Sequence, residues 1–180
     1  MDRIKIKDKY FKPFIPESRI EQAINEVAEH VNADFSGSQD VPVILCVLNG
    51  AIPFTGRLLT KLTFDCQLVS IKLSSYQGTK STGTVLNIMG LTADVRGRRV
   101  IICEDIVDTG TTINALRELL LDKGATDVKI CTMLMKPDVY DKPAPIDYVG
   151  MEIPDAFIVG YGLDYDELGR NIRDIYVIDE

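Results

Sequence analysis

The sequence predicts an α/β fold: a mostly parallel central sheet flanked by helices. Two observations lead to this prediction. Apolar runs of strand length alternate with segments whose apolar residues recur at helical spacing, and glycine or proline stands at several boundaries. The chain has 180 residues, of which 46% are hydrophobic and 26% charged, and it contains no repeat or low-complexity segment. We therefore expect a single domain over residues 1–180.

The first predicted helix covers residues 18–32. Apolar residues recur there at helical spacing, namely Ile20, Ala23, Ile24, Val27, Ala28 and Val31. Ser18 followed by Glu21 has the pattern of a capping box, in which each side chain bonds the backbone N–H of the other residue. The sequence therefore predicts an amphipathic helix with Ser18 at its cap.

Two strands are predicted next. The apolar run at residues 43–48 is too short for a core helix and predicts a buried strand, which Asn49 and Gly50 end. Pro53 suits an early position of the following helix, because the N–H that proline lacks would have no partner there. Residues 66–73 predict the second strand.

Residues 74–84 are polar and show neither period, so we expect a mobile loop. Residues 99–103 predict a further strand. A helix over residues 112–123 follows, and Gly124 closes it. The next predicted strand covers residues 128–135. Because these strands alternate with helices, the sheet should be mostly parallel, with helices on both faces.

The charge of the chain argues against a nucleic-acid partner. The formal net charge is −7 and the sequence pI is near 4.8, whereas a nucleic-acid coat needs a basic face. No apolar run approaches the length of a membrane span, and the segment MDRIKIKDKYFKPF is too charged for a signal peptide. We therefore expect a cytoplasmic protein without a membrane partner.

Histidine and cysteine chemistry has little support. His30 is the sole histidine and lies in the first predicted helix, which disfavours a Ser-His-Asp site or a histidine-based metal site. The cysteines stand singly in or beside apolar runs, without C-x-x-C spacing, so they should be reduced core thiols. They are Cys46, Cys66, Cys103 and Cys131.

One stretch predicts a ligand site, VIICEDIVDTGTT at residues 100–112. Ligands of open parallel sheets bind at the carboxyl ends of strands, and this stretch lies at such an end. A helix starting near Thr111 would direct backbone N–H groups into the loop, and Gly110 would allow a close approach, which suits a phosphate. Alone, Thr-Gly-Thr-Thr is also typical of an ordinary helix cap. The P-loop lysine and the G-x-G-x-x-G pattern are missing, which disfavours a nucleotide hydrolase and a Rossmann dehydrogenase.

Three carboxylates stand beside this predicted phosphate site: Glu104, Asp105 and Asp108. They would repel a phosphate that they faced, so they should serve another part of the same ligand. Neighbouring sugar hydroxyls fit, because carboxylates accept short, strong hydrogen bonds from them. A solvated acidic loop is the alternative, but Glu104 and Asp105 directly follow the apolar run Val-Ile-Ile-Cys.

This stretch resembles the phosphoribosyl-diphosphate signature of type I phosphoribosyltransferases: four apolar residues, two acidic, two apolar, Asp-Thr-Gly, then hydroxyl residues. Three further segments are similar to the hypoxanthine-guanine branch of that family, namely KLSSYQGTKSTG at 72–83, VGMEIPDAFIVGYGLDYDELGR at 149–170, and YVIDE. The resemblance implies that family's fold, with a small hood formed by the terminal segments. It also implies transfer of a phosphoribosyl group from phosphoribosyl diphosphate to a 6-oxopurine base.

The resemblance assigns the sugar side of the site. Glu104 and Asp105 would bind the 2′ and 3′ hydroxyls of the ribose. The 5′-phosphate would lie in the loop formed by Asp108, Thr109, Gly110, Thr111 and Thr112. Asp108 would also lie near N7 of the purine and act as the general base.

The resemblance implies Mg²⁺ as the cofactor, because the departing pyrophosphate needs its charge neutralised. The implied metal ligands are Asp164, Glu104 and Asp105. Arg170, whose planar fork suits that anion, would meet the pyrophosphate together with Asn49 and Gly50. Asn49 stands where the family usually has a basic residue. Taken alone, Asp164 within LDYDELGR is also typical of a surface helix cap.

The purine side is implied in the same way. Phe157 would stack on the base, and backbone groups of Ile158 and Asp164 would read its edge. Lys136 would donate to the 6-oxo group. Taken singly, Phe157 is more typical of a core strand, and Lys136 is more typical of a solvated loop.

A lid and several alternatives complete the expectations. Ser75 and Tyr76 resemble part of a lid that closes over the reacting centre and excludes water. Lys136 and the block IPDAFIVG favour a 6-oxopurine but leave xanthine, or another base, as an alternative. A nucleic-acid-binding regulator that kept the fold is the alternative of a different class. Family members are usually dimers or tetramers, so we expect a homodimer or homotetramer.

Overall fold

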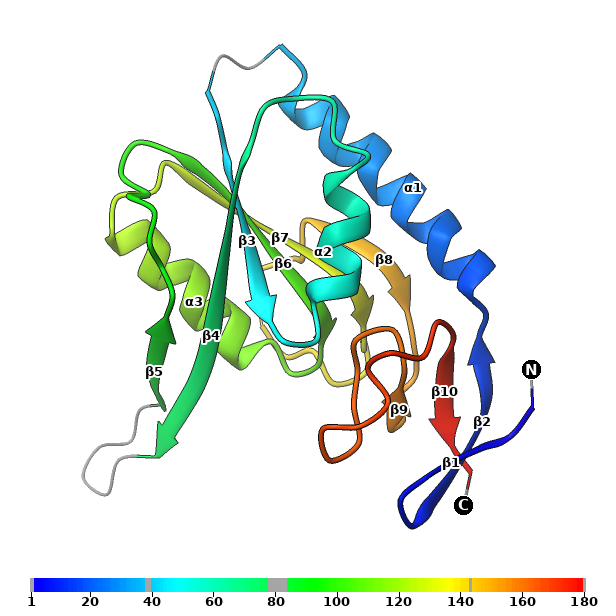
Figure 1. Ribbon diagram of the computed structural model, residues 1–180. Coiled ribbons are helices and arrows are strands. Elements are labelled where there is room, and N and C mark those ends of the chain that lie inside the picture. Colours follow the sequence, from blue (N-terminus) through cyan, green and yellow to red (C-terminus); the bar gives the residue numbers. More distant parts are fainter. Residues whose placement is uncertain (1, 38–39, 78–83, 143, 180) are drawn as a thin grey trace.

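The computed structural model describes residues 2–37, 40–77, 84–142 and 144–179. The strands of its central sheet are β3 Val43–Leu48, β4 Gln67–Gln77, β5 Thr84–Met89, β6 Arg99–Val107, β7 Asp127–Met135 and β8 Tyr148–Glu152. They lie in the order β5-β4-β3-β6-β7-β8 (Figure 1). Among these strands β5 pairs antiparallel with β4, and the other neighbours pair parallel. The predicted mostly parallel sheet is therefore confirmed.

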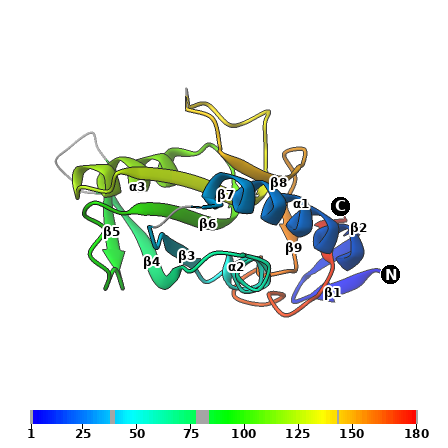
Figure 2. The same ribbon diagram turned by 90° about the horizontal axis from the view of Figure 1, so that it is seen from above.

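Apolar side chains on successive strand residues enter two cores, one on each face of the sheet. Ile44 packs into one core and its neighbour Leu45 into the other, as the period of two requires. The helices are α1 Glu17–Phe35, α2 Ile52–Leu59 and α3 Thr111–Asp122. Buried apolar residues of α1 and α2 belong to the first core and those of α3 to the second, so helices cover both faces (Figure 2).

A second sheet forms the hood that the resemblance implies. Its strands are β1 Ile4–Ile6, β2 Lys9–Ile15, β9 Ile158–Val159 and β10 Ile175–Ile178. They pair antiparallel in the order β1-β2-β10-β9, so the two ends of the chain share one sheet. Figure 1 shows this sheet on the side to which the arrow of β3 points. The hood therefore lies on the same side of the central sheet as the carboxyl end of β3.

The predicted capping box is wrong. α1 begins at Glu17, Pro16 holds the cap position without a side-chain hydrogen bond, and Ser18 lies inside the first turn. The Glu17 N–H donates instead to Asp174 Oδ1 at 2.7 Å. A carboxylate at this position also interacts favourably with the helix dipole. The cap comes from a residue 157 positions later, which a local pattern cannot reveal.

The loop predicted over residues 74–84 is partly wrong. Residues 74–77 continue β4 and Thr84 begins β5, so that Ser75 pairs with Leu86 and Tyr76 with Val85. Polar residues can form a strand when the backbone finds a partner, and the test for apolar alternation misses such a strand. Residues 78–83 of the predicted lid lie outside the described residues.

Other boundaries agree more closely. β3 covers the predicted residues 43–48, and a proline stands in the first turn of α2, as expected. α3 begins one residue before the predicted start. β6 runs to Val107, beyond the predicted end at residue 103, so Glu104 and Asp105 belong to the strand itself. No helix of the described residues is both long and apolar enough to cross a membrane.

Candidate active site

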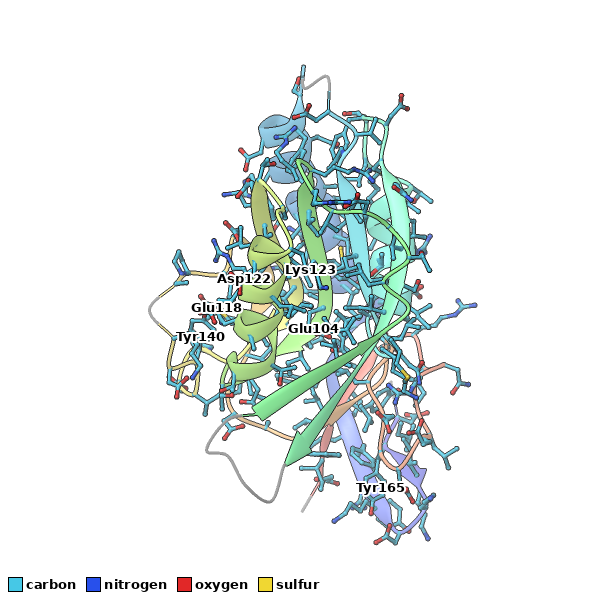
Figure 3. The ribbon with its side chains drawn as sticks, turned by 90° about the vertical axis from the view of Figure 1, so that its left-hand side faces the viewer. Glu104, Glu118, Asp122, Lys123, Tyr140 and Tyr165 are labelled. Carbon is cyan, nitrogen blue, oxygen red and sulfur yellow. The ribbon has the colours of Figure 1, made fainter. Side chains whose placement is uncertain are left out.

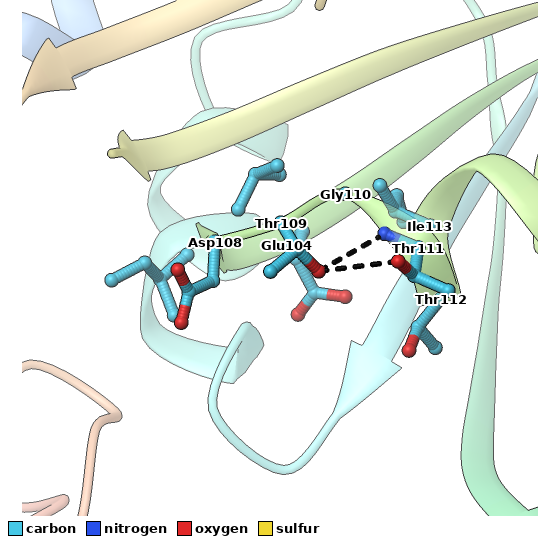
Figure 4. Close-up of a pocket in the computed structure, with 9 residues that line it drawn as sticks. Glu104, Asp108, Thr109, Gly110, Thr111, Thr112 and Ile113 are labelled. Atoms are coloured by element: carbon cyan, nitrogen blue, oxygen red, sulfur yellow. Dashed lines mark hydrogen bonds between the residues drawn. The ribbon is translucent and has the colours of Figure 1, made fainter. Parts of the chain in front are cut away.

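A pocket of about 140 Å³ lies where β6 leads into α3, and it is lined by Glu104 and residues 106–113 (Figure 4). Gly110 caps α3 with φ 78°, in the left-handed region that favours glycine. Thr109 Oγ1 accepts a hydrogen bond from the Thr111 N–H at 3.4 Å, and the hydroxyl oxygens of these two threonines lie 3.2 Å apart. The residues predicted to hold a phosphate thus surround one hollow at a helix N-terminus.

Tyr140 and Asn114 support this loop, and Tyr140 lies beside α3 (Figure 3). A Cβ at Gly110 would lie 2.3 Å from Tyr140 Cε2, so the ring occupies the space of a side chain there. Asn114 Nδ2 donates to Gly110 O at 2.9 Å and to Tyr140 Oη at 3.2 Å. Tyr140 in turn donates to Ala144 O at 2.5 Å. No pattern in the sequence predicts these contacts, because Tyr140 stands in a segment without periodicity.

Glu104 and Asp105 are neighbouring carboxylates near the end of β6. Burial, and then the charge of Asp105, raise the pKa of Glu104 well above its usual value. Asp105 Oδ1 accepts a hydrogen bond from the Ile106 N–H at 2.8 Å. Hydroxyl donors or a cation would relieve the penalty on the charge of Glu104. The pair is therefore suited to bind sugar hydroxyls or a metal ion.

Two glycines let three segments meet beside these carboxylates. A Cβ at Gly50 would lie 1.5 Å from Asp105 Oδ2, so the carboxylate occupies the space of a side chain there. A Cβ at Gly162 would lie 1.9 Å from Gly50 O, which brings the segment after β9 equally close. The peptide bond between Leu48 and Asn49 is cis. The loop after β3 thus lies between Asp105 and Gly162.

Arg170 and Asp164 bind each other. Arg170 Nη2 lies 2.8 Å from Asp164 Oδ1, and Arg170 Nη1 donates to Gly162 O at 2.8 Å. Asp164 Oδ2 accepts a hydrogen bond from the Glu167 N–H at 2.8 Å. Because Gly162 contacts Gly50, Arg170 is linked to the loop after β3. The residues predicted to meet pyrophosphate are therefore joined through one glycine contact.

The candidate metal ligands form two separate positions. Within the part of the chain that the structure describes, no three acidic, histidine or cysteine side chains are grouped so that they could hold a metal ion. Asp164 is therefore not grouped with Glu104 and Asp105 in this structure. Mg²⁺ often takes one or two carboxylates and fills its other positions with water and substrate phosphate. The pair Glu104 and Asp105 fits such a partial site.

Lys136 is a buried cation directly after β7. Only 8% of its surface is exposed, so the alternative of a solvated loop lysine is wrong. Its Nζ donates to Asp155 Oδ1 at 2.8 Å and lies 3.8 Å from Asp108 Oδ2. The predicted general base and the predicted reader of the 6-oxo group are therefore neighbours. Asp155 was not predicted as a site residue.

Phe157 belongs to an aromatic cluster at the hood, with ring centroids 5.9 Å from Tyr165 and 6.3 Å from Phe11. Because 46% of its surface is exposed, it is not a core strand residue, and its ring is open to a stacking partner. Ile158 is buried in β9, where it pairs with Val177 of β10. The lid residues Ser75 and Tyr76 lie in β4, and their side chains are outside the description.

Comparisons with known proteins identify the family of this chain. A family model described as a phosphoribosyl transferase domain matches residues 16–166. Hypoxanthine-guanine phosphoribosyltransferase from Lactococcus lactis is 39% identical over 170 residues, which are 93% of this chain and 90% of the relative. The Streptococcus pneumoniae protein of the same name is 35% identical over 94% of this chain and 93% of its own.

Solved structures show the same fold. A hypoxanthine phosphoribosyltransferase from Staphylococcus aureus superposes with a TM-score of 0.85 at 33% identity, covering 93% of this chain and 91% of that one. A mutant of the Trypanosoma cruzi enzyme, solved as a ternary substrates complex, gives a TM-score of 0.85 at 34% identity, over 93% of this chain and 95% of that one.

Proposed function

Because this chain belongs to the phosphoribosyltransferase family, we propose that it transfers the 5-phosphoribosyl group of phosphoribosyl diphosphate to hypoxanthine and guanine. A bond forms between N9 of the purine and C1′ of the sugar as the bond from C1′ to pyrophosphate breaks. The product is a nucleoside monophosphate, which makes this a purine salvage reaction. The observation that carries the choice of base is the buried Lys136 ammonium 3.8 Å from the Asp108 carboxylate.

Each part of the site has a task in this reaction. The pocket at the start of α3 binds the 5′-phosphate through backbone N–H groups, and Glu104 and Asp105 accept hydrogen bonds from the ribose hydroxyls. Arg170 and the loop of Asn49 and Gly50 bind the departing pyrophosphate. Asp108 takes the proton from N7 of the purine as the new bond forms at N9.

The purine binds between Phe157 of the hood and Lys136, which follows β7. Phe157 stacks on the base, Lys136 donates to its 6-oxo group, and backbone groups of Ile158 and Asp164 read its edge. The lid with Ser75 and Tyr76 excludes water from the reacting centre. We propose that Glu104 and Asp105 would hold one Mg²⁺ ion, and that Asp164 would be a ligand at a second Mg²⁺ position. When bound, the ion neutralises charge on the pyrophosphate.

The assembly and place of the protein are part of the same proposal. The whole chain is one phosphoribosyltransferase domain that acts in the cytoplasm as a homodimer or homotetramer. Light scattering coupled to gel filtration measures the oligomeric state. A monomer that turns over at the full rate would contradict a homodimer or homotetramer as the active form.

Turnover of phosphoribosyl diphosphate with hypoxanthine, guanine, xanthine, adenine and uracil tests the function. Hypoxanthine and guanine should react fastest, with Mg²⁺ required, and Asp108→Asn should be slow with every base. Preferred turnover of xanthine or uracil would assign another base. Full activity in excess chelator would reject the metal requirement. Absence of turnover with every base, together with retention on a nucleic-acid column at physiological salt, would favour the regulator.

A further inference from the structure

Asp155 is a charged neighbour of the purine site that has no task in the mechanism above. It lies in the segment between β8 and β9, two residues before Phe157. Its Oδ1 accepts a hydrogen bond from Lys136 Nζ at 2.8 Å, whereas Asp108 Oδ2 lies 3.8 Å from the same nitrogen. The first distance is a full hydrogen bond, and the second is beyond hydrogen-bond length. The Lys136 ammonium is thus hydrogen-bonded to Asp155 and forms a longer ion pair with Asp108.

Lys136 is buried, whereas its two carboxylate neighbours, Asp155 and Asp108, are exposed. The Lys136 side chain is 11% exposed, so its ammonium needs a carboxylate partner. The side chains of Asp155 and Asp108 are 60% and 57% exposed, so water still solvates both carboxylates. Without Asp155, the carboxylate left to pair with the ammonium among the described residues would be that of Asp108. The lysine would then move toward the group that must accept a proton.

We propose that Asp155 is a positioning residue, whose carboxylate holds Lys136 away from Asp108 in the orientation that donates to the 6-oxo group. This inference rests on the proposed function. A lysine ammonium has three donors and no acceptor, so one hydrogen bond to Asp155 leaves others for the purine. Asp108 keeps its oxygens for N7. Asp155 therefore contributes to the choice of 6-oxopurine over adenine without contact with the sugar.

Asp155→Ala tests this role by steady-state kinetics. kcat/KM for hypoxanthine should fall about tenfold, the loss of one hydrogen bond to a charged group, and the advantage of hypoxanthine over adenine should narrow. KM for phosphoribosyl diphosphate should stay within about twofold of wild type. Asp155→Asn keeps an acceptor oxygen, so its kcat/KM for hypoxanthine should lie between those of wild type and Asp155→Ala. Asp94→Ala is the matched control, because Asp94 is an exposed aspartate paired with Arg96 at 2.9 Å outside the site.

A double-mutant cycle with Lys136→Met separates action through Lys136 from direct contact with the base. If Asp155 acts through Lys136, then Asp155→Ala should add no further loss of base discrimination in the Lys136→Met background. Additive losses would overturn the inference. If the wild-type protein is active and Asp155→Ala has the same kcat/KM values as the control Asp94→Ala, the inference is also overturned. The same holds if Asp155→Ala lowers Tm but keeps the wild-type preference for hypoxanthine over adenine. A wild-type protein inactive on every base would instead contradict the proposed function.

Discussion

Glu104 carries a charge that becomes harder to keep when the chain folds. Burial and the charge of Asp105 raise its pKa above the usual 4.5, so the folded protein binds this proton more tightly than the unfolded chain. In the range between 4.5 and the raised pKa, the folded state holds more protons, and stability therefore falls as pH rises. At neutral pH the ligand-free protein is therefore destabilised by the buried charge of Glu104, which the site needs as a carboxylate.

Glu104→Gln should therefore stabilise the ligand-free protein at pH 7. The amide has nearly the same shape and no charge to desolvate, so Tm should exceed that of wild type, and the difference should shrink as pH approaches 4.5. Thermal unfolding across this pH range measures the effect. Glu29→Gln, at an exposed position of α1, should follow wild type at every pH. A Glu104→Gln protein less stable than wild type at pH 7 would contradict the prediction.

The same carboxylates should control affinity for the sugar. Replacing Glu104 and Asp105 by Gln and Asn removes charged acceptors, at roughly 1.5–3 kcal/mol per lost hydrogen bond. Binding of phosphoribosyl diphosphate should weaken much more than binding of free purine, and calorimetry measures both. Unchanged affinity for the sugar would mean that the ribose hydroxyls bind elsewhere.

The elements predicted correctly are those whose own residues carry a strong pattern. β3 is a continuous apolar run, and α1 and α3 have apolar residues at helical spacing. The strands of the hood were implied only by the resemblance, because β1 and β9 are very short and β2 is rich in charged and aromatic residues. Such strands exist because the other end of the chain supplies their partners. Propensity alone cannot reveal them.

The site follows the same rule. Residues within one local motif, such as Glu104 and Gly110, could be predicted from their spacing and composition. Tyr140 and Asp155 could not, because each contacts a residue of another segment. Lys136 shows both cases: the resemblance indicated its task, but its burial became evident only in the folded chain.

The turn from β6 to α3 should depend on the glycine at its centre. Gly110→Ala would place a Cβ 2.3 Å from the Tyr140 ring at φ 78°, so both the backbone and the ring must shift. The left-handed conformation alone costs about 1–2 kcal/mol for an L-residue. Affinity for phosphoribosyl diphosphate should fall at least tenfold, as measured by calorimetry.

Gly97→Ala is the matched control for this turn. Gly97 has φ 70°, and its Cβ would meet nothing within 4 Å. This variant should lose similar backbone stability and keep its sugar affinity. Equal losses of affinity in the two variants would show that the contact with Tyr140 does not shape the pocket.

At the scale of the whole molecule, the hood joins the two ends of the chain and also caps α1. Asp174→Ala removes the acceptor of the Glu17 N–H, which should cost about 0.5–2 kcal/mol of stability. Tm should fall by about 2–4 °C for each kcal/mol in a domain of this size. Ser18→Ala, at the residue that the local pattern wrongly predicts as the cap, should change stability by less than about 0.5 kcal/mol. A larger loss from Ser18→Ala than from Asp174→Ala would contradict the cap seen in the structure.

Glu17 is synthesised well before Asp174, the residue that accepts its N–H hydrogen bond. The two residues are 157 positions apart, so a ribosome adding about 5–20 residues per second makes the second roughly 8–30 s after the first. During that interval β3, β4, β6 and β7 can already pair, whereas β2 has no β10 beside it and the start of α1 has no cap. The residues that line the phosphate pocket are therefore all synthesised before Phe157. A nascent chain stalled before residue 174 would contain Phe11, Phe157 and Tyr165 but would lack β10, the strand that pairs with both β2 and β9 in the hood.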